Sequence, residues 1–336
     1  MAGFDVPRDE WVAGPPPAGV NESVFTSLVH DLVHRPTEAG ATHAFLAIAN
    51  GHIVSEWYGE GLAADSTLIS WSIAKSITHA LIGCAVDDGL LSLEQTHLMP
   101  EWDRDERSTI TLRDLLTMRS GLSWVEDYVD GSVSDVIEML FGDASLVGDH
   151  AAFASAKPLI EIPGAKWEYS SGTTNILCRI LANALGEESG SNRKVLAFMN
   201  ERLFDPIGMK AIPKFDKVGT FVGSSYVYAT ARDFARFGYL YLNGGQWGSR
   251  SVLSSDWVND AARTVTRVTD SNMGYSTQWW TWPDDEGSMI AHGYEGQLVW
   301  VSPRRNVVVV HLGKTVEPHV DPLRRHVARI IQQFPE

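Results

Sequence analysis

Ser72 and Lys75 have the residue types and the spacing for nucleophilic chemistry, in the segment Ser72-Ile-Ala-Lys75. On a helix, positions three apart share a face, so the lysine amine can reach the serine hydroxyl. The following residues predict such a helix, ending at Gly89, with one apolar stripe: Ile73, Ile77, Ala80, Leu81, Cys84 and Ala85. A lysine beside an apolar body can lose its proton near neutral pH, and a helix N-terminus favours negative charge on the serine oxygen. The segment therefore predicts a nucleophilic serine with a lysine base.

The same pattern occurs a second time, in Ser191-Asn-Arg-Lys194. This copy lies in a polar stretch, Gly-Glu-Glu-Ser-Gly-Ser-Asn, where a solvated lysine stays charged. Ser72, in contrast, opens an apolar helix directly after a predicted hairpin. Context therefore favours Ser72 over Ser191.

Two further segments could assist such a serine. Tyr169 precedes an expected helix, and its hydroxyl could shuttle a proton between serine, leaving group and water. The alternative is a half-buried tyrosine with its hydroxyl in solvent. The segment from Ala291 to Gln297 joins two expected strands, and its glycines let the Tyr294 N–H approach and polarise a carbonyl oxygen. The alternative is an ordinary hairpin with one extra histidine, His292.

Sheet-forming elements lie at both chain ends. Near the N-terminus, an Asn21-capped helix precedes two apolar runs, 44–49 and 53–58, joined by Asn50-Gly51, a strong hairpin signal. Near the C-terminus, strands are expected at 289–292, 298–301 and 307–312, before a helix opened by Asp321-Pro322. Helical stripes dominate between them. The pattern predicts an α/β domain from residues 1–70 and 285–336, with a mainly helical domain, 71–284, inserted.

Composition excludes several classes of protein. The 336 residues are 44% hydrophobic and 21% charged, which is typical of a globular protein and excludes disorder and coiled coil. A net charge of −15 opposes binding to nucleic acid or anionic membranes, and the apolar runs are too short to span a bilayer. Charges and prolines occupy the N-terminus where a signal peptide has an apolar run, so a cytoplasmic location is expected. His30 and His34 have zinc-compatible spacing but no third ligand of matching pattern, so no metal is expected.

Four motifs together resemble the serine β-lactamase-like superfamily, and most closely its class C branch. They are Ser72-x-x-Lys75, Leu115-Leu-Thr-Met-Arg-Ser-Gly-Leu122, Tyr169-Ser-Ser-Gly172 and Ala291-His-Gly-Tyr-Glu-Gly-Gln297. Within that branch the chain is similar to the 6-aminohexanoate-dimer hydrolase group and the family VIII carboxylesterases. Supporting phrases occur at 231–238, 242–248 and 273–280, and the likeness runs from about residue 40 to the C-terminus.

The resemblance implies a β-lactamase/transpeptidase-like fold, an antiparallel sheet flanked by terminal helices plus the inserted helical domain, with the active site in the cleft between the domains. It implies Ser72 as nucleophile, Lys75 as base and Tyr169 as proton relay, with the backbone N–H groups of Ser72 and Tyr294 as oxyanion hole. It also suggests substrate contacts, which are Tyr128 in a covering loop, Ser171 and His292. Tyr128 is alternatively an exposed aromatic residue in a loop.

Two positions depart from the family pattern. Ser171 stands where relatives often have the asparagine of Tyr-x-Asn, and Ala291 stands where β-lactamases have the lysine of Lys-Thr-Gly. Without that lysine, no cation pairs with a β-lactam carboxylate, so efficient β-lactamase activity is not expected.

We expect a cofactor-independent serine hydrolase acting on small esters or linear amides. Two alternatives remain open, an acyltransferase with the same acyl-enzyme and a non-catalytic binding member of the fold. The intact Ser72, Lys75 and Tyr169 argue against the second. Partners are expected to be small-molecule substrates, and a homodimer is left open because the sequence does not determine the oligomeric state.

Overall fold

The computed structural model describes residues 6–7, 10–128, 131, 133–142, 148–269, 271, 273–283 and 285–336. These residues divide into two compact units. Unit 1 contains the residues up to Ile73, Phe204–Ile212 and Tyr228–Glu336, and unit 2 contains Ala74–Leu203 and Pro213–Val227. Residues 1–5, on which part of the signal-peptide expectation rests, lie outside the described ranges.

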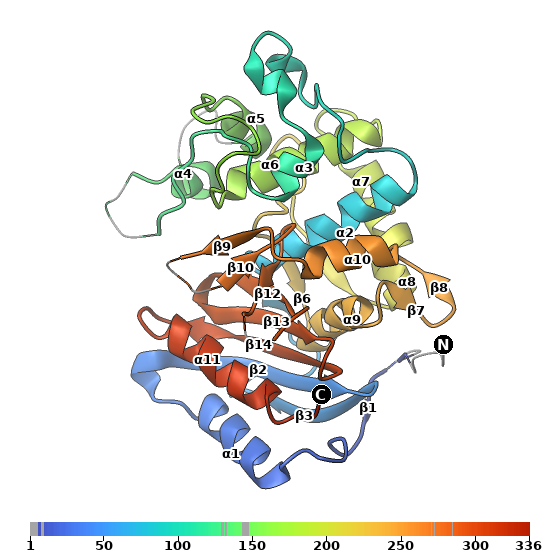
Figure 1. Cartoon of the computed structure of the whole chain (residues 1–336), viewed down its shortest axis with the longest axis vertical. Coiled ribbons are helices and arrows are strands. Elements are labelled where there is room, and N and C mark those ends of the chain that lie inside the picture. Colours follow the sequence, from blue (N-terminus) through green and yellow to red (C-terminus); the bar gives the residue numbers. More distant parts are fainter. Residues whose placement is uncertain are drawn as a thin grey trace. The chain divides into compact units, whose positions relative to one another are not determined.

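Unit 1 is built on one large sheet that joins both ends of the chain (Figure 1). Over the described ranges its nine strands follow the order β1-β3-β2-β14-β13-β12-β11-β10-β9. The strand pairs are antiparallel except for β1 with β3. The strands are β1 (Val12–Ala13), β2 (Gly40–Ala49), β3 (His52–Tyr58), β9 (Thr266–Val268), β10 (Met273–Tyr275), β11 (Trp280–Thr281), β12 (Met289–Gly293), β13 (Gln297–Ser302) and β14 (Val307–Thr315). Because β2 pairs with β14, strands from both ends of the chain lie in the same sheet.

The hairpin between β2 and β3 forms where the sequence predicts it. Asn50 and Gly51 both have positive φ, 50° and 78°. Two successive left-handed residues match the twist of antiparallel strands, and Asn-Gly is the dipeptide that adopts them at least cost.

Helices cover both faces of the sheet in unit 1. Helices α1 (Glu22–Val33) and α11 (Val320–Ile331) pack on one face, and Asn21 caps α1 by accepting from the Val24 N–H at 3.2 Å. Their buried cluster is apolar: Phe25, Leu28, Leu32, Phe45, Ala47, Trp300, Val309, Leu323, Val327 and Ile330. Helix α9 (Ala231–Leu242) lies on the other face of the sheet, where it packs on β13 and β14 through side chains such as Val299 and Val308. Unit 1 is therefore a helix–sheet–helix layer structure.

Gly238 allows α9 to approach this sheet closely. A Cβ at Gly238 would lie 2.7 Å from Val308 Cγ1 and 2.8 Å from Val299 Cγ1. Such distances are shorter than packed carbon atoms tolerate, so only glycine fits without displacement of the strands.

The remaining elements of unit 1 are short. They include α8 (Asp205–Ile207), α10 (Ser255–Ala262), the hairpin β7 (Gln246–Trp247) with β8 (Arg250–Ser251), and 3₁₀ turns at Thr37–Ala39 and Tyr294–Gly296. A second sheet has the order β4-β6-β5, from Leu68–Ile69, Val227–Ala229 and Ala211–Pro213.

The unit boundaries differ from the predicted domain boundaries. The described residues between Tyr228 and Pro283 group with unit 1, although the sequence analysis placed them in the inserted domain. The reason is that β9, β10 and β11 hydrogen-bond in series to β12, and α9 packs on the same sheet.

Unit 2 is mainly helical, as expected for the inserted part. Its helices are α2 (Ile73–Asp87, from Ala74 on), α3 (Leu112–Leu116), α4 (Asp135–Phe141), α5 (His150–Ser155), α6 (Ser171–Ala184) and α7 (Arg193–Met199), with 3₁₀ turns at Pro100–Trp102 and Glu106–Thr109 and a π-helical turn at Asn200–Phe204. Thr111 and Asp114 form a reciprocal capping box that starts α3. Cys84 and Cys178 are buried thiols on α2 and α6 and are not joined in a disulfide. Among the described helices, none combines the length and the apolar character needed to cross a membrane.

Candidate active site

Helix α2 carries Lys75 into the core of unit 2. The helix begins at Ile73, directly after Ser72, and Gly89, with φ of 73°, follows its end. Its predicted apolar stripe is fully buried, and the intervening side chains are buried as well. Because this helix is buried on all sides, Lys75 is only 2% exposed.

The Lys75 amine has partners from two other segments of unit 2. Nζ donates to Ser171 Oγ at 2.9 Å and to the Ser224 carbonyl at 3.0 Å, and it lies 4.9 Å from the ring centre of Tyr169. Burial lowers the pKa of Lys75 to about 8, although the nearby Glu126 carboxylate opposes that shift. A lysine with this pKa is neutral in a useful fraction of molecules near neutral pH and can accept a proton.

Tyr169 and Ser171 are positioned by the start of α6. Ser170 caps the helix, its Oγ accepting from the Thr173 N–H at 2.9 Å, so Tyr169 lies just outside the first turn, where it is half-buried. Gly172 permits the close approach of Trp124, since a Cβ there would lie 2.5 Å from the indole Cζ3. The Tyr-Ser-Ser-Gly sequence thus combines a cap with a contact that only glycine permits.

Glu126 is a residue that the sequence analysis did not assign. Its Oε1 accepts from Ser171 Oγ at 2.5 Å and from the Tyr128 hydroxyl at 2.8 Å. Its Oε2 accepts from the Ser171 N–H at 2.9 Å and from Trp124 Nε1 at 2.6 Å. Trp124 and Tyr128, two residues before and after it, are local donors, but the contact that links Glu126 to the site is with Ser171, 45 residues later in the chain.

The predicted oxyanion residues both belong to unit 1, where their segments lie side by side. A Cβ on Gly293 would lie 2.5 Å from the Ser70 carbonyl oxygen, so this glycine allows the two backbones to touch. The rings of Trp71 and Tyr294 meet edge to face, with centroids 5.8 Å apart. Trp71, the residue before Ser72, has a φ of 43°, a left-handed conformation that is costly for a tryptophan and is typical of functional turns.

The remaining predicted substrate residues have defined surroundings. Tyr128 is 38% exposed, and its hydroxyl donates to Glu126. The hydroxyl of Ser171 lies between Lys75 and Glu126. His292 is half-buried near Trp280, and burial lowers the pKa of its imidazole to about 3, so the ring is neutral at physiological pH. Their predicted substrate contacts stay predictions.

The structure therefore groups the predicted residues in two sets. Unit 2 brings together Lys75, Tyr169, Ser171 and Tyr128 around the unpredicted Glu126. Unit 1 holds Ser72, His292 and Tyr294. The chemical roles predicted for all of them stay predictions.

The second Ser-x-x-Lys copy has structural partners. Ser191 Oγ donates to Glu187 at 2.7 Å, and Lys194 Nζ donates to the Gly186 carbonyl at 2.6 Å. Lys194 is exposed, and its contacts fix the loop before α7. This arrangement agrees with the preference for Ser72.

The two spaced histidines on α1 stack on each other. The ring centroids of His30 and His34 lie 4.4 Å apart, and both side chains are exposed. In the part of the chain that the structure describes, no three His, Cys, Asp or Glu side chains are grouped so as to hold a metal ion.

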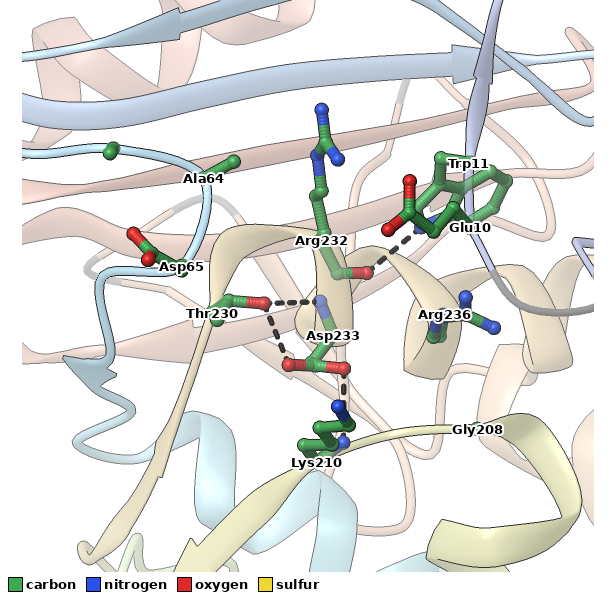
Figure 2. A pocket seen from close by; sticks show the side chains of 11 residues that line it. Glu10, Trp11, Ala64, Asp65, Gly208, Lys210, Thr230, Arg232, Asp233 and Arg236 are labelled. Atoms are coloured by element: carbon green, nitrogen blue, oxygen red, sulfur yellow. Dashed lines mark hydrogen bonds between the residues drawn. The ribbon is translucent and has the colours of Figure 1, made fainter.

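Unit 1 also contains an open pocket of about 510 Å³ (Figure 2). Figure 2 shows Thr230, Asp233 and Lys210 joined by hydrogen bonds, and the indole of Trp11 bonded to the Arg232 backbone oxygen. These hydrogen bonds join residues of the pocket wall to one another, and we make no catalytic assignment to the pocket.

Comparison with known proteins identifies the family. The beta-lactamase family model matches residues 27–333. A 6-aminohexanoate-dimer hydrolase of Paenarthrobacter ureafaciens is 24% identical over 338 residues, which cover 91% of this chain and 81% of that protein.

Solved structures show the same fold. A Bacillus anthracis protein provisionally assigned as a 6-aminohexanoate-dimer hydrolase has a TM-score of 0.76 at 21% identity, covering 97% of this chain and 89% of its own. EstCE1, described as a hydrolase with promiscuous acyltransferase activity, has a TM-score of 0.71 at 13% identity, covering 93% and 98%. The β-lactamase/transpeptidase-like fold expected from the sequence is thereby confirmed. The chain belongs to the beta-lactamase family, within the serine β-lactamase-like superfamily of hydrolases.

Proposed function

We propose that the protein is a serine hydrolase that forms an acyl-enzyme on Ser72. The observation that carries the proposal is the buried Lys75, whose pKa of about 8 suits it to act as a base, three residues after that serine. The ring of Tyr169, 4.9 Å from the lysine amine, supports a role in the same proton transfers.

In the proposed mechanism, Ser72 Oγ attacks the carbonyl carbon while Lys75 Nζ accepts the hydroxyl proton. The backbone N–H groups of Ser72 and Tyr294 stabilise the oxyanion. The tetrahedral intermediate then expels the alcohol or amine, which receives its proton through Tyr169. Water attacks the acyl-enzyme, its proton returning through Tyr169 and Lys75, and the acid leaves as Ser72 is restored.

We propose small esters or linear amides as substrates. The named relative, a 6-aminohexanoate-dimer hydrolase, supports linear ω-amino-acid amides. Ala291, 1% exposed on β12, offers no cation at the position where β-lactamases carry one, which disfavours β-lactams. The net charge of −15 disfavours nucleic acid as a partner.

The intact mass of the protein after exposure to a fluorophosphonate tests the nucleophile. We expect one adduct on the wild type, the same adduct on Ser191→Ala and none on Ser72→Ala. Loss of the adduct in Ser191→Ala instead would overturn the assignment. A folded wild type without adduct would support the non-catalytic binding alternative.

The relay is tested by Tyr169→Phe, assayed on ester substrates and on the 6-aminohexanoate dimer. We expect turnover to fall by a factor of about 10² or more, the usual contribution of a proton-transfer group. Turnover equal to that of the wild type would remove the role assigned to Tyr169.

Acyl transfer is a second candidate function, favoured by the likeness to EstCE1. The same acyl-enzyme would then be released by an alcohol or amine in place of water. Addition of an alcohol acceptor to the ester assay distinguishes the two, because transfer yields a new ester whereas hydrolysis yields the acid alone.

A further inference from the structure

The Glu126 carboxylate is saturated by donors from its own chain. Two donors reach each of its oxygens, so its four acceptor positions are filled. No acceptor position therefore remains for a substrate ammonium group. Glu126 is therefore suited to act on the protein and unsuited to bind substrate.

Ser171 connects this carboxylate to the lysine. A hydroxyl has one proton to donate, and Ser171 donates it to Glu126 at 2.5 Å. Its oxygen then presents only lone pairs to Lys75 Nζ, which lies 2.9 Å away on the other side. Glu126 thus fixes the direction of the hydrogen bond that Ser171 makes with Lys75.

We infer that Glu126 is a positioning residue, which through Ser171 orients the Lys75 amine and sets the pH range in which that amine can act as a base. The inference rests on the proposed function, since it supplies the regulation of the base proposed there. Trp124 and Tyr128 hold the carboxylate in place by their hydrogen bonds.

The groups around Lys75 support this role. The titratable side chains that face it are Glu126 from the loop before α4, Tyr169 before α6 and Cys178 within α6. Burial raises the pKa of the Cys178 thiol to about 12, so it is neutral near pH 8. Burial lowers the pKa of Lys75 and Glu126 raises it, so removal of the glutamate charge would lower that pKa further.

The substitution Glu126→Gln keeps a side chain of the same size and reverses the direction of its hydrogen bond with the Ser171 hydroxyl. The amide oxygen can still accept from the Ser171 N–H and Trp124, which places the amide NH₂ toward the hydroxyls. Ser171 Oγ would then accept from Gln and donate to the lone pair of a neutral Lys75. Both the lost charge and the reversed bond favour the neutral amine.

The experiment is a ¹³C NMR titration of protein labelled at lysine Cε, with the Lys75 signal assigned by its loss in Lys75→Arg. In Glu126→Gln we expect the Lys75 midpoint to fall by about 1 pH unit, the usual effect of one nearby charge. The acid limb of the pH–rate profile should move to lower pH by the same amount. In Glu126→Asp, which keeps the charge, the midpoint should return toward the wild-type value.

The matched control is Glu101→Gln. Glu101 accepts a similar bond from Ser155 Oγ, at 2.7 Å, also within unit 2. The Lys75 midpoint should be unchanged in this variant. If Glu126→Gln does not fold, Ser171→Ala tests the same connection, because its methyl group cannot accept from Lys75 and the midpoint should again fall.

The outcomes separate this inference from the proposed function. An unchanged Lys75 midpoint in the folded variant refutes the role of Glu126, even if Ser72-dependent turnover is present. A shifted Lys75 midpoint in a protein that hydrolyses no ester or amide supports the effect of Glu126 on Lys75 and refutes the proposed function.

Discussion

Lys75→Met should change the stability of the protein in a pH-dependent way that follows from burial of the lysine. The pKa of Lys75 falls from its ordinary 10.5 to about 8 in the folded state, chiefly because of burial. In the unfolded chain the amine keeps its ordinary pKa, so between pH 8 and 10.5 the unfolded state binds more protons than the folded state. The contribution of Lys75 to the free energy of unfolding therefore increases as the pH rises from 8 to 10.5.

The magnitude follows from the shift. A change of about 2.5 pKa units corresponds to roughly 3 kcal/mol, the cost of holding the charged amine in the core below pH 8. Between pH 7 and pH 9.5 about 2 kcal/mol of this cost disappears. Methionine has no such cost, but it leaves the Ser224 carbonyl without its lysine donor, a penalty of about 1–3 kcal/mol that is independent of pH.

Urea unfolding followed by tryptophan fluorescence measures the effect. The free energy of unfolding of Lys75→Met minus that of the wild type should fall by about 2 kcal/mol from pH 7 to pH 9.5. Lys194→Met is the control, because it makes the same substitution at an exposed position and removes no amine from the core. A constant difference for Lys75→Met across this range would refute the reasoning about burial.

Three further predictions concern the scaffold. Gly238→Ala should lower the free energy of unfolding by about 1–3 kcal/mol, measured by urea titration, because its Cβ would collide with Val308. Burial raises the pKa of Glu56, but hydrogen bonds from Arg232 lower it on balance, so Arg232→Met should cost more stability at pH 7 than at pH 3, measured by thermal unfolding. Thr111→Ala should cost about 1 kcal/mol by urea titration, because it removes the capping box of α3.

The ends of the chain could be predicted from sequence because their signals are local. Asn50-Gly51 specifies its turn within two residues, and the apolar repeat of α11 identifies the face that meets the sheet. Strands β9, β10 and β11 have only two or three residues each, too few for an alternating pattern to stand out. Their place in the sheet is decided by hydrogen bonds to β12, which no local pattern reveals.

The residues of the candidate site also divide into those with a local sequence signal and those decided by distant contacts. Ser72, Lys75 and Tyr169 could be proposed because their segments have recognisable spacing and context. Glu126 could not be proposed, since its place in the site depends on a contact with Ser171, 45 residues later in the chain. The substrate contact of Ser171 stays a prediction, and the structure adds that its hydroxyl bonds to Lys75 and Glu126.

The two Ser-x-x-Lys copies show what the motif leaves undetermined. The spacing gives the lysine its reach in both copies, yet only Lys75 lies in a helix whose side chains are buried on every side, where burial brings its pKa to about 8. Lys194 stays in solvent and bonds to a loop carbonyl. A base of this type therefore requires the hydrophobic surroundings as much as the serine. Since such burial destabilises the fold, a buried lysine with a lowered pKa is itself an argument that the amine serves chemistry.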